Sequence, residues 1–278
     1  MWAAVVAVGR GADGYERYDD DVATLWDRIG DAGAGRLHYV LRHPGRAWTG
    51  LRGAQGARLH YEPCGGPGAR ALLTTLSRRR LTRRDLALFG AAVLEVPADP
   101  AILLVGRRQQ TLRRMLRKAE QAGLTCRAVP PNERAALLTR VNAMERRHRL
   151  EAYRVAEPTN DDLLEHPLWR VCEREGRPVL LVVVPVDGAW SCPRYFRTLG
   201  ARAPHARALA RWVATYDLVA QLSARGVRHP LDTEPPAVQT NGVRHFQRMV
   251  VFRYVVVRRA HPRGRRADPQ SSASPALE

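Results

Sequence analysis

The chain has 278 residues, 45% of them hydrophobic, which suffices for one large domain or for two compact halves of roughly 100–150 residues each. Its 45 Lys and Arg residues outnumber 27 acidic residues and give a formal net charge of +18, so we expect it to bind polyanions in a salt-dependent way. No apolar run approaches the roughly 20 residues of a membrane-spanning helix, and residues 1–8 lack the basic leader of a secretion signal.

The cations are almost all arginine. Lys118 is the single lysine, so arginine supplies the other 44 positive charges. A high content of Ala, Gly and Pro accompanies this preference, and both are typical of a GC-rich coding sequence. Such a bias explains why arginine replaces lysine, but it does not explain the excess of cations over acids. The excess therefore favours a nucleic acid or another polyanion as a partner.

Cysteine usage indicates the compartment. Four cysteines, at positions 64, 126, 172 and 192, are widely spaced and form no C-x-x-C pair. This pattern favours neither a disulfide framework nor a zinc site, and it fits a reduced compartment. We therefore expect a cytoplasmic protein with no metal.

An apparent dinucleotide-binding pattern lies near the start of the chain. Residues 9–14 match G-x-G-x-x-G, but the acidic residues 19–21 follow where a pyrophosphate should be attracted. Those acids fit better at the N-terminus of a helix over residues 20–32, where they face the positive end of its dipole.

The next segments predict short elements between turns. Apolar runs and Gly- or Pro-rich breaks predict a strand at residues 37–41, turns and loops over 43–68, a helix or a strand at 69–76, a short helix at 82–89 and a strand at 93–96.

The clearest helix covers residues 107–122 and ends before Gly123. Its apolar residues recur at spacings of three and four and define one face. The opposite face carries five cations, Arg107, Arg113, Arg114, Arg117 and Lys118. Glu120 is the single acid available to pair with them, so the face is either solvated or neutralised by an anionic partner. The uncompensated repulsion favours the partner.

The remaining elements follow in a regular order. The patterns predict a strand at residues 124–129, helices at 132–149 and 159–173, a hairpin of 177–186 and 189–199 around an Asp-Gly turn, a helix at 206–225, a strand at 227–232, a short helix at 243–250 and a strand at 254–258.

Three local patterns in this region carry a resemblance. Residues 112–124 read LRRMLRKAEQAGL, residues 144–148 read MERRH, and residues 224–248 contain ARGVR, LD and NGVRHFQR. Together with the element order, they resemble the Fem-type branch of the GNAT-like acyltransferases, over residues 100–258. The resemblance implies a mixed α/β (α+β), GNAT-like fold of two halves, a degenerate one over 1–123 and a better formed one over 124–260, followed by a disordered tail over 261–278.

The resemblance also bears on the acyl donor. Acyl-CoA users of the GNAT superfamily hold the pyrophosphate on an R/Q-x-x-G-x-G/A loop, and Arg197, Gly200 and Arg202 stand at its first, fourth and sixth positions. Arg202 replaces the tiny last residue and obstructs close approach of the backbone, although its charge could bind a phosphate from outside. Two further departures are Gln247, where many relatives carry lysine, and Val251, where they carry glycine.

Candidate catalytic residues lie where the strand expected over 227–232 gives way to a Pro-rich loop, and in that loop. Asp232 and Glu234 are plausible general bases and equally plausible solvated acids, and Asn241 either orients a carbonyl or makes an Asn-Gly turn. Tyr195 and Trp190 either line an acceptor cleft or belong to the core. For tRNA, the candidate contacts are the five cations of residues 107–118 together with Arg146 and Arg147.

The function implied by the resemblance is transfer of an amino acid from aminoacyl-tRNA to an amine of a small peptide or peptide-like acceptor. Such an enzyme makes an amide bond in natural-product biosynthesis or cell-wall assembly. We expect no cofactor, tRNA as co-substrate, and an acceptor that is free or bound to a carrier protein. Two alternatives stay open: an acyl-CoA-dependent N-acyltransferase and a non-catalytic RNA-binding protein.

Overall fold

A computed structural model describes residues 36–45, 48–49, 58–77, 91–107, 109–147, 151, 154–199, 204–233, 239, 241–250 and 252–260. The expected elements at residues 20–32 and 82–89, the glycine pattern at 9–14 and the tail after residue 260 lie outside this part of the chain. The first elements are α2 (Arg36–Arg42), β1 (Arg58–Tyr61), α4 (Gly66–Ser77), β2 (Ala91–Leu94) and the 3-10 helix η2 (Pro100–Leu104).

The rest of the chain is denser in secondary structure. Its elements are α6 (Gln110–Gln121), β3 (Leu124–Ala128), α7 (Pro131–Arg146), the 3-10 helix η4 (Asp161–Glu165), β4 (Leu168–Arg174), β5 (Arg177–Val184), β6 (Val186–Asp187), β7 (Trp190–Ser191), β8 (Tyr195–Thr198), α8 (Pro204–Ala224), β9 (His229–Pro230), α9 (Asn241–Met249) and β10 (Phe252–Arg259).

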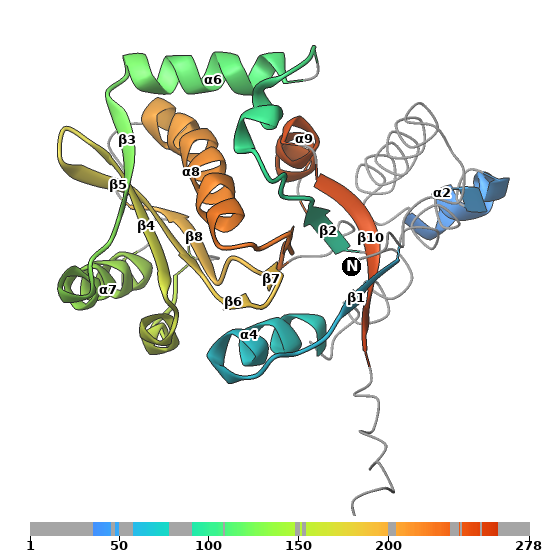
Figure 1. Cartoon of the computed structure of the whole chain (residues 1–278), viewed down its shortest axis with the longest axis horizontal. Coiled ribbons are helices and arrows are strands. Elements are labelled where there is room, and N and C mark those ends of the chain that lie inside the picture. The colour runs from blue at the N-terminus through green and yellow to red at the C-terminus, as the bar shows by residue number, and fades with distance from the viewer. Residues whose placement is uncertain are drawn as a thin grey trace, which may run out of the picture.

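A four-stranded antiparallel sheet, in the order β3-β4-β5-β8, lies between two helical layers. Alternate strand residues face opposite sides, so each face has its own core. Val182 and Val184 belong to the cluster with α8 and α6, whereas Leu181 and Val183 belong to the cluster with α7. Figure 1 shows α6 and α8 on one side of this sheet and α7 on the other.

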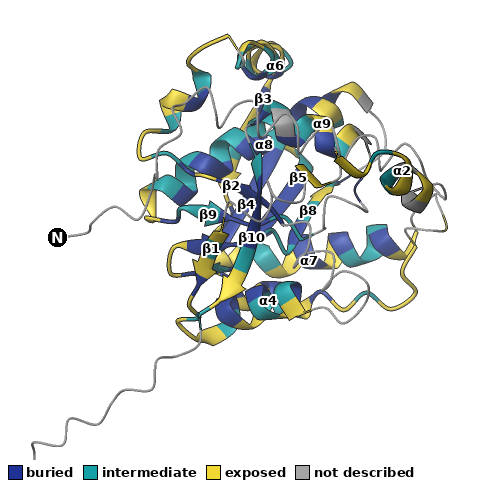
Figure 2. Cartoon of the chain, turned by 90° about the vertical axis from the view of Figure 1, so that its right-hand side faces the viewer, coloured by how far each residue is buried: buried dark blue, intermediate teal, exposed yellow. Residues whose placement is uncertain are grey.

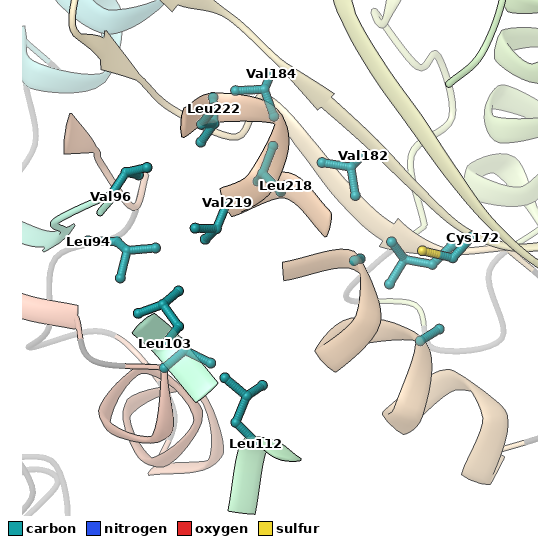
Figure 3. Close-up of a cluster of buried hydrophobic side chains, with 14 of the residues drawn as sticks. Leu94, Val96, Leu103, Leu112, Cys172, Val182, Val184, Leu218, Val219 and Leu222 are labelled. Carbon is teal, nitrogen blue, oxygen red and sulfur yellow. The ribbon is translucent and has the colours of Figure 1, made fainter. Parts of the chain in front are cut away.

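The core on the α8 side also ties the main sheet to β2. Leu218, Val219 and Leu222 project from α8 between the strand residues Val182 and Val184 and the segment that holds Leu94 and Val96 (Figure 3). Buried residues concentrate on the strands and on the inward sides of the helices, and exposed residues cover the outer side of α6 (Figure 2). The helix α8 is therefore packed against both the main sheet and the segment of β2.

Ion pairing fixes α8 on the sheet as well. The guanidinium of Arg170 on β4 donates two hydrogen bonds, of 2.7 and 2.6 Å, to the carboxylate of Asp217 on α8. Both side chains are largely buried, at 10% and 18% exposed. A two-pronged pair with this geometry restricts the rotation of the helix on the sheet as well as its position.

The hairpin after β5 leaves the main sheet and joins a second one. Its outer part, β6 and β7, turns at Gly188, and β7 pairs in parallel with β9. Leu231, directly after β9, bridges to Val93 of β2, and β2 pairs with β10, which in turn pairs in parallel with β1. The strand β10 thus lies between two strands from the first hundred residues (Figure 1). Segments of the two expected halves share one sheet.

Two contacts hold α4 and the segment that precedes it against this hairpin. Gly68 in the first turns of α4 lies so close to the backbone carbonyl of Val186 that a Cβ atom would overlap it. The hydroxyl of Tyr61 donates a 2.6 Å hydrogen bond to the buried carboxylate of Asp187, which also accepts from the backbone N–H of Cys64 at 3.0 Å. Burial, then the bond to Asp187, raises the pKa of Tyr61.

The mixed α/β class expected from the sequence is confirmed, with three corrections to its elements. Residues 37–41 belong to helix α2 and do not form a strand. The expected helix over 159–173 is wrong, since η4 and β4 occupy that span. The loop expected over 43–68 contains β1, which is held by pairing with β10 far along the chain.

The cysteine interpretation also needs correction, because Cys126 and Cys172 form a disulfide. They are 46 residues apart, but antiparallel pairing of β3 with β4 sets them directly opposite each other. Spacing along the chain could not reveal this neighbourhood, so the inference of a cytoplasmic location from cysteine usage loses its basis. No helix in the described ranges is both long and apolar enough to cross a membrane.

Candidate active site

A cleft of about 990 Å³ opens where the parallel strands β7 and β9 separate. Trp190 and Ser191 of β7 pair with His229 and Pro230 of β9. After β7 the backbone returns to the main sheet as β8, which pairs with β5. After β9 it runs the other way, where Leu231 bridges to β2. The divergence leaves a gap between two strand ends, with α8 and α9 along it. The backbone therefore creates the cleft, and side chains from the flanking strands β8 and β9, from α7, α8 and α9, and from β2 and β10 line it.

The floor of the cleft is apolar. Trp212 of α8 and Phe246 of α9 meet edge to face, with ring centroids 4.7 Å apart, and both are partly buried. Leu218, Leu222 and Leu94 continue the apolar surface inward. Such a floor holds the uncharged part of a ligand and excludes water from polar groups beside it, which strengthens their electrostatic effect.

Asp232 lines the cleft at the end that follows β9. Its backbone N–H donates to the carbonyl of Ala92, and its carboxylate accepts a 2.6 Å hydrogen bond from Nε2 of Gln247 on α9. Gln247 is 2% exposed, and its Oε1 has no hydrogen-bond partner in the described part of the chain. The carboxylate is thus held in place at the cleft wall, where it can accept a proton from a bound amine.

Cations line the cleft on the α8 side. Arg207 and Arg211 are four residues apart and so lie one above the other on the helix. Arg211 is exposed and Arg207 is half-buried, and neither forms an ion pair with any residue that the structure describes. Two guanidinium groups that pair with no described acid, at one rim of a cleft, have the charge and the donor geometry that phosphate recognition needs.

A second polar group lies on the α7 side. Nη1 of Arg197, on β8, donates a 3.0 Å hydrogen bond to Glu145 of α7, and Nδ2 of Asn160 donates to the same carboxylate at 2.9 Å. The guanidinium lies 5.7 Å from the ring centroid of Tyr195. Burial, then the charge of Glu145, raises the pKa of Tyr195.

The sequence-based candidates are only partly brought together. Asp232 and Arg197 both line the cleft, on different walls. Arg197 is bound to Glu145 on the α7 side, although the sequence pattern assigned it to a donor loop. Asn241 is the first residue of α9. The other three candidates, Glu234, Gly200 and Arg202, lie outside the described residues.

The basic helix is exposed but not uniform. Arg113 donates from Nη1 to the carbonyls of Leu104 and Gly106, at 2.6 and 2.7 Å, and so closes the end of η2. The exposed cations of this region are Arg107, Arg114, Arg117 and Lys118. Arg146 and Arg147 are exposed as well, at the end of α7 and thus on the other side of the main sheet. The structure does not bring these two groups onto one surface (Figure 1).

Several cleft residues escaped the sequence analysis. Asn160, Arg207 and Arg211 belong to no motif, and single arginines in an arginine-rich chain carry no signal. Glu145 lies within the MERRH pattern but was not singled out there as a site residue. Gln247 was noted for replacing lysine, which was the one available sign that its position matters. Tyr195, left open between cleft and core, lines the cleft while 3% exposed, whereas Trp190 packs in the core between Tyr61 and His229. No group of three or more His, Cys, Asp or Glu side chains in the described ranges could hold a metal ion.

Comparisons with known proteins give distant structural similarity. No protein-family model matches the chain, and no curated protein sequence is similar to it. The chain is similar to the C-terminal domain (DUF2156) of a protein from Agrobacterium fabrum assigned as a lysylphosphatidylglycerol synthetase, at 17% identity and a TM-score of 0.40 over 51% of this chain and 45% of that one. It is also similar to L-PGS from Bacillus licheniformis, at 17% identity and a TM-score of 0.38 over 51% and 43%. The chain thus covers less than half the length of either structure.

Proposed function

We propose that the protein is an acyltransferase that moves the aminoacyl group of an aminoacyl-tRNA onto an amine, in the cleft between β8 and β9. One observation carries the proposal: around an apolar floor, the cleft presents a fixed carboxylate, Asp232, and two arginines, Arg207 and Arg211, that pair with no acid in the described part of the chain. The finer parts of the proposal are a Fem-type relationship and an acceptor amine on a small peptide or peptide-like molecule.

The charges of the cleft suit the two substrates. The 3′ end of a charged tRNA carries phosphates beside its ester, and the arginine rim on α8 would hold them. Helix α6 packs on α8 and adds the exposed cations Arg114, Arg117 and Lys118, so the cationic surface extends beyond the cleft. A long polyanion such as tRNA would contact the whole of this surface, whereas the phosphates of CoA would contact only Arg207 and Arg211 at the rim. The extended surface therefore favours tRNA.

The reaction needs little beyond positioning, because an aminoacyl ester is already activated. The acceptor ammonium loses a proton to Asp232, and its nitrogen attacks the ester carbonyl carbon. The new C–N bond forms, the tetrahedral intermediate collapses, and the C–O bond to the tRNA ribose breaks. The ribose oxygen leaves with the proton that Asp232 returns, and the second proton of the attacking nitrogen passes to solvent, so that a neutral amide and a free ribose hydroxyl remain. Holding both substrates on one apolar floor supplies proximity, which alone accounts for several kcal/mol of the barrier, on the order of 7–11 kcal/mol in well-oriented cases.

A donor comparison tests the proposal. The full-length protein is mixed with a primary amine and either a pool of charged tRNA or acetyl-CoA, and amide product is measured by mass spectrometry. We expect product from charged tRNA. Vesicles of phosphatidylglycerol are added in a further reaction as an alternative acceptor, because this lipid is in the name of the similar protein from Agrobacterium fabrum. Product from acetyl-CoA alone would replace the proposed donor with CoA, and tight RNA binding without turnover would leave a binding protein.

A further inference from the structure

Resting on the transferase proposed above, we infer that Arg197 is a specificity residue that binds an anionic group, a carboxylate or a phosphate, on the acceptor. The inference starts from the position of this arginine. It lines the cleft, its side chain is 51% exposed, and one of its nitrogens, Nη1, is used by Glu145. Its Nε and Nη2 make no hydrogen bond in the described part of the chain. One edge of the guanidinium is therefore fixed and another is open to the cleft.

The surroundings of Arg197 are built to hold it still. Glu145 is buried and accepts from both Arg197 and Asn160, and Asn160 also donates to Oδ1 of Asn142 at 2.9 Å. The ring of Tyr195, whose hydroxyl is buried, lies beside the guanidinium. An arginine fixed by a carboxylate and an aromatic ring loses little conformational entropy when it binds a ligand, and its planar fork matches the oxygens of carboxylate and phosphate.

We assign this anion to the acceptor because Arg197 lies on the α7 side of the main sheet, away from the arginines proposed for the donor. Tyr195 packs in the core on the α7 side, and Glu145 extends to Arg197 from α7 itself. The arginines proposed for the donor, Arg207 and Arg211, project from α8 on the opposite face. Two substrates meet in the cleft. On the α7 side, Arg197 is the cation with an open edge, and no contact to the donor has been proposed for it.

A binding experiment tests the inference without turnover. The ¹⁵Nε–Hε resonance of Arg197 is followed by NMR in the full-length protein while inorganic phosphate or acetate is added. We expect a saturable shift with at least one of them. In Arg197→Lys, which lacks this resonance and is followed through the backbone amide of residue 197, we expect an affinity for that anion about tenfold weaker, because the charge stays and the fork is lost. Arg177→Lys, an exposed arginine at the start of β5, is the matched control. No saturable shift with either anion would overturn the inference, whatever the donor proves to be.

A turnover experiment separates the acceptor from the donor. Ethanolamine, phosphoethanolamine and β-alanine are compared as acceptors with charged tRNA. We expect the KM of one anionic amine to be about tenfold lower than that of ethanolamine, and this preference to vanish in Arg197→Gln while the KM for tRNA stays constant. The double variant Glu145→Gln/Arg197→Gln, which leaves no buried unpaired charge, must give the same result. A raised KM for tRNA with an unchanged acceptor preference would place the anion on the donor and contradict the inference.

Discussion

Asp232 is the side chain on which the proposed chemistry depends, and its partner makes it testable. Asparagine at this position keeps the shape and can still accept from Gln247, but it cannot take a proton. We expect Asp232→Asn to lower the rate of amide formation in a single-turnover assay by about 10²–10⁴-fold, the contribution of a general base, with the Tm unchanged. Asp161→Asn, at an exposed acid in η4, is the control. Full activity in Asp232→Asn would mean that the substrate amine loses its proton elsewhere.

Two histidines, His166 (buried) and His229 (half-buried), make the fold sensitive to acid. Burial is the main cause that lowers the pKa of His166 and His229 below the ordinary value of 6.5, and Nδ1 of each lacks a hydrogen-bond partner in the described residues. Their unfolded forms bind protons more tightly than the folded ones, so stability is full above pH 6.5 and falls as the pH drops below it.

We expect each histidine to reduce the free energy of unfolding by up to about 1.4 kcal/mol per pH unit below pH 6.5, until its folded pKa is reached. Urea unfolding at a series of pH values measures this. His229→Phe keeps an aromatic ring beside Trp190, whose centroid is 4.8 Å away, and should reduce the slope. An unchanged slope in that variant would show that His229 does not titrate with folding.

At the scale of elements, the approach of α4 to β6 depends on Gly68. Alanine would place its Cβ on the carbonyl oxygen of Val186, so either the helix moves away or the hairpin does. We expect Gly68→Ala to destabilise the protein by about 1–3 kcal/mol, as overpacking does, despite the better helix propensity of alanine. Thr74→Ala, on the exposed side of the same helix, should change stability by less than about 0.5 kcal/mol. A Gly68→Ala protein as stable as this control would mean that α4 packs elsewhere.

Elements with a strong local pattern were predicted well, and those shaped by distant partners were not. Helix α6 repeats its apolar residues at spacings of three and four, and the Asp187-Gly188 turn specifies its hairpin, so both are confirmed. The strand β4 was mistaken for a helix because its residues 168–172 are all buried. A strand buried on both faces shows no alternation, and short apolar runs fit either element.

At the scale of the whole molecule, the cleft could be predicted only in part. Asp232 was named because it follows a strand, but its partner Gln247 and the facing group of Glu145 and Arg197 come from segments whose proximity depends on the full sheet order. The same limit hid the disulfide between Cys126 and Cys172. Residue type and spacing report on neighbours along the chain, whereas these contacts join residues 15 to 52 positions apart.

The net charge of +18 and the exposed cations of α6 give an expectation for RNA binding. The logarithm of the affinity for tRNA should fall linearly with the logarithm of the salt concentration. Arg117→Gln/Lys118→Gln on α6 should reduce that slope by about one unit for each phosphate that is no longer neutralised. Arg146→Gln/Arg147→Gln removes the same charge from α7, on the other side of the sheet, and should have the smaller effect. Equal effects of the two pairs in a filter-binding titration would rule out α6 as the preferred surface.

The central claim is that the cleft between β8 and β9 is the place of aminoacyl transfer, and a steric block tests it most directly. Ala208 of α8 is exposed and lines the cleft, whereas Ala224 is exposed at the end of the same helix and does not. In a single-turnover assay with charged tRNA and a primary amine, Ala208→Trp should lower amide formation by about 100-fold or more, because misplaced reactants lose proximity, and Ala224→Trp should match the unsubstituted protein. Full transfer by Ala208→Trp would contradict the account.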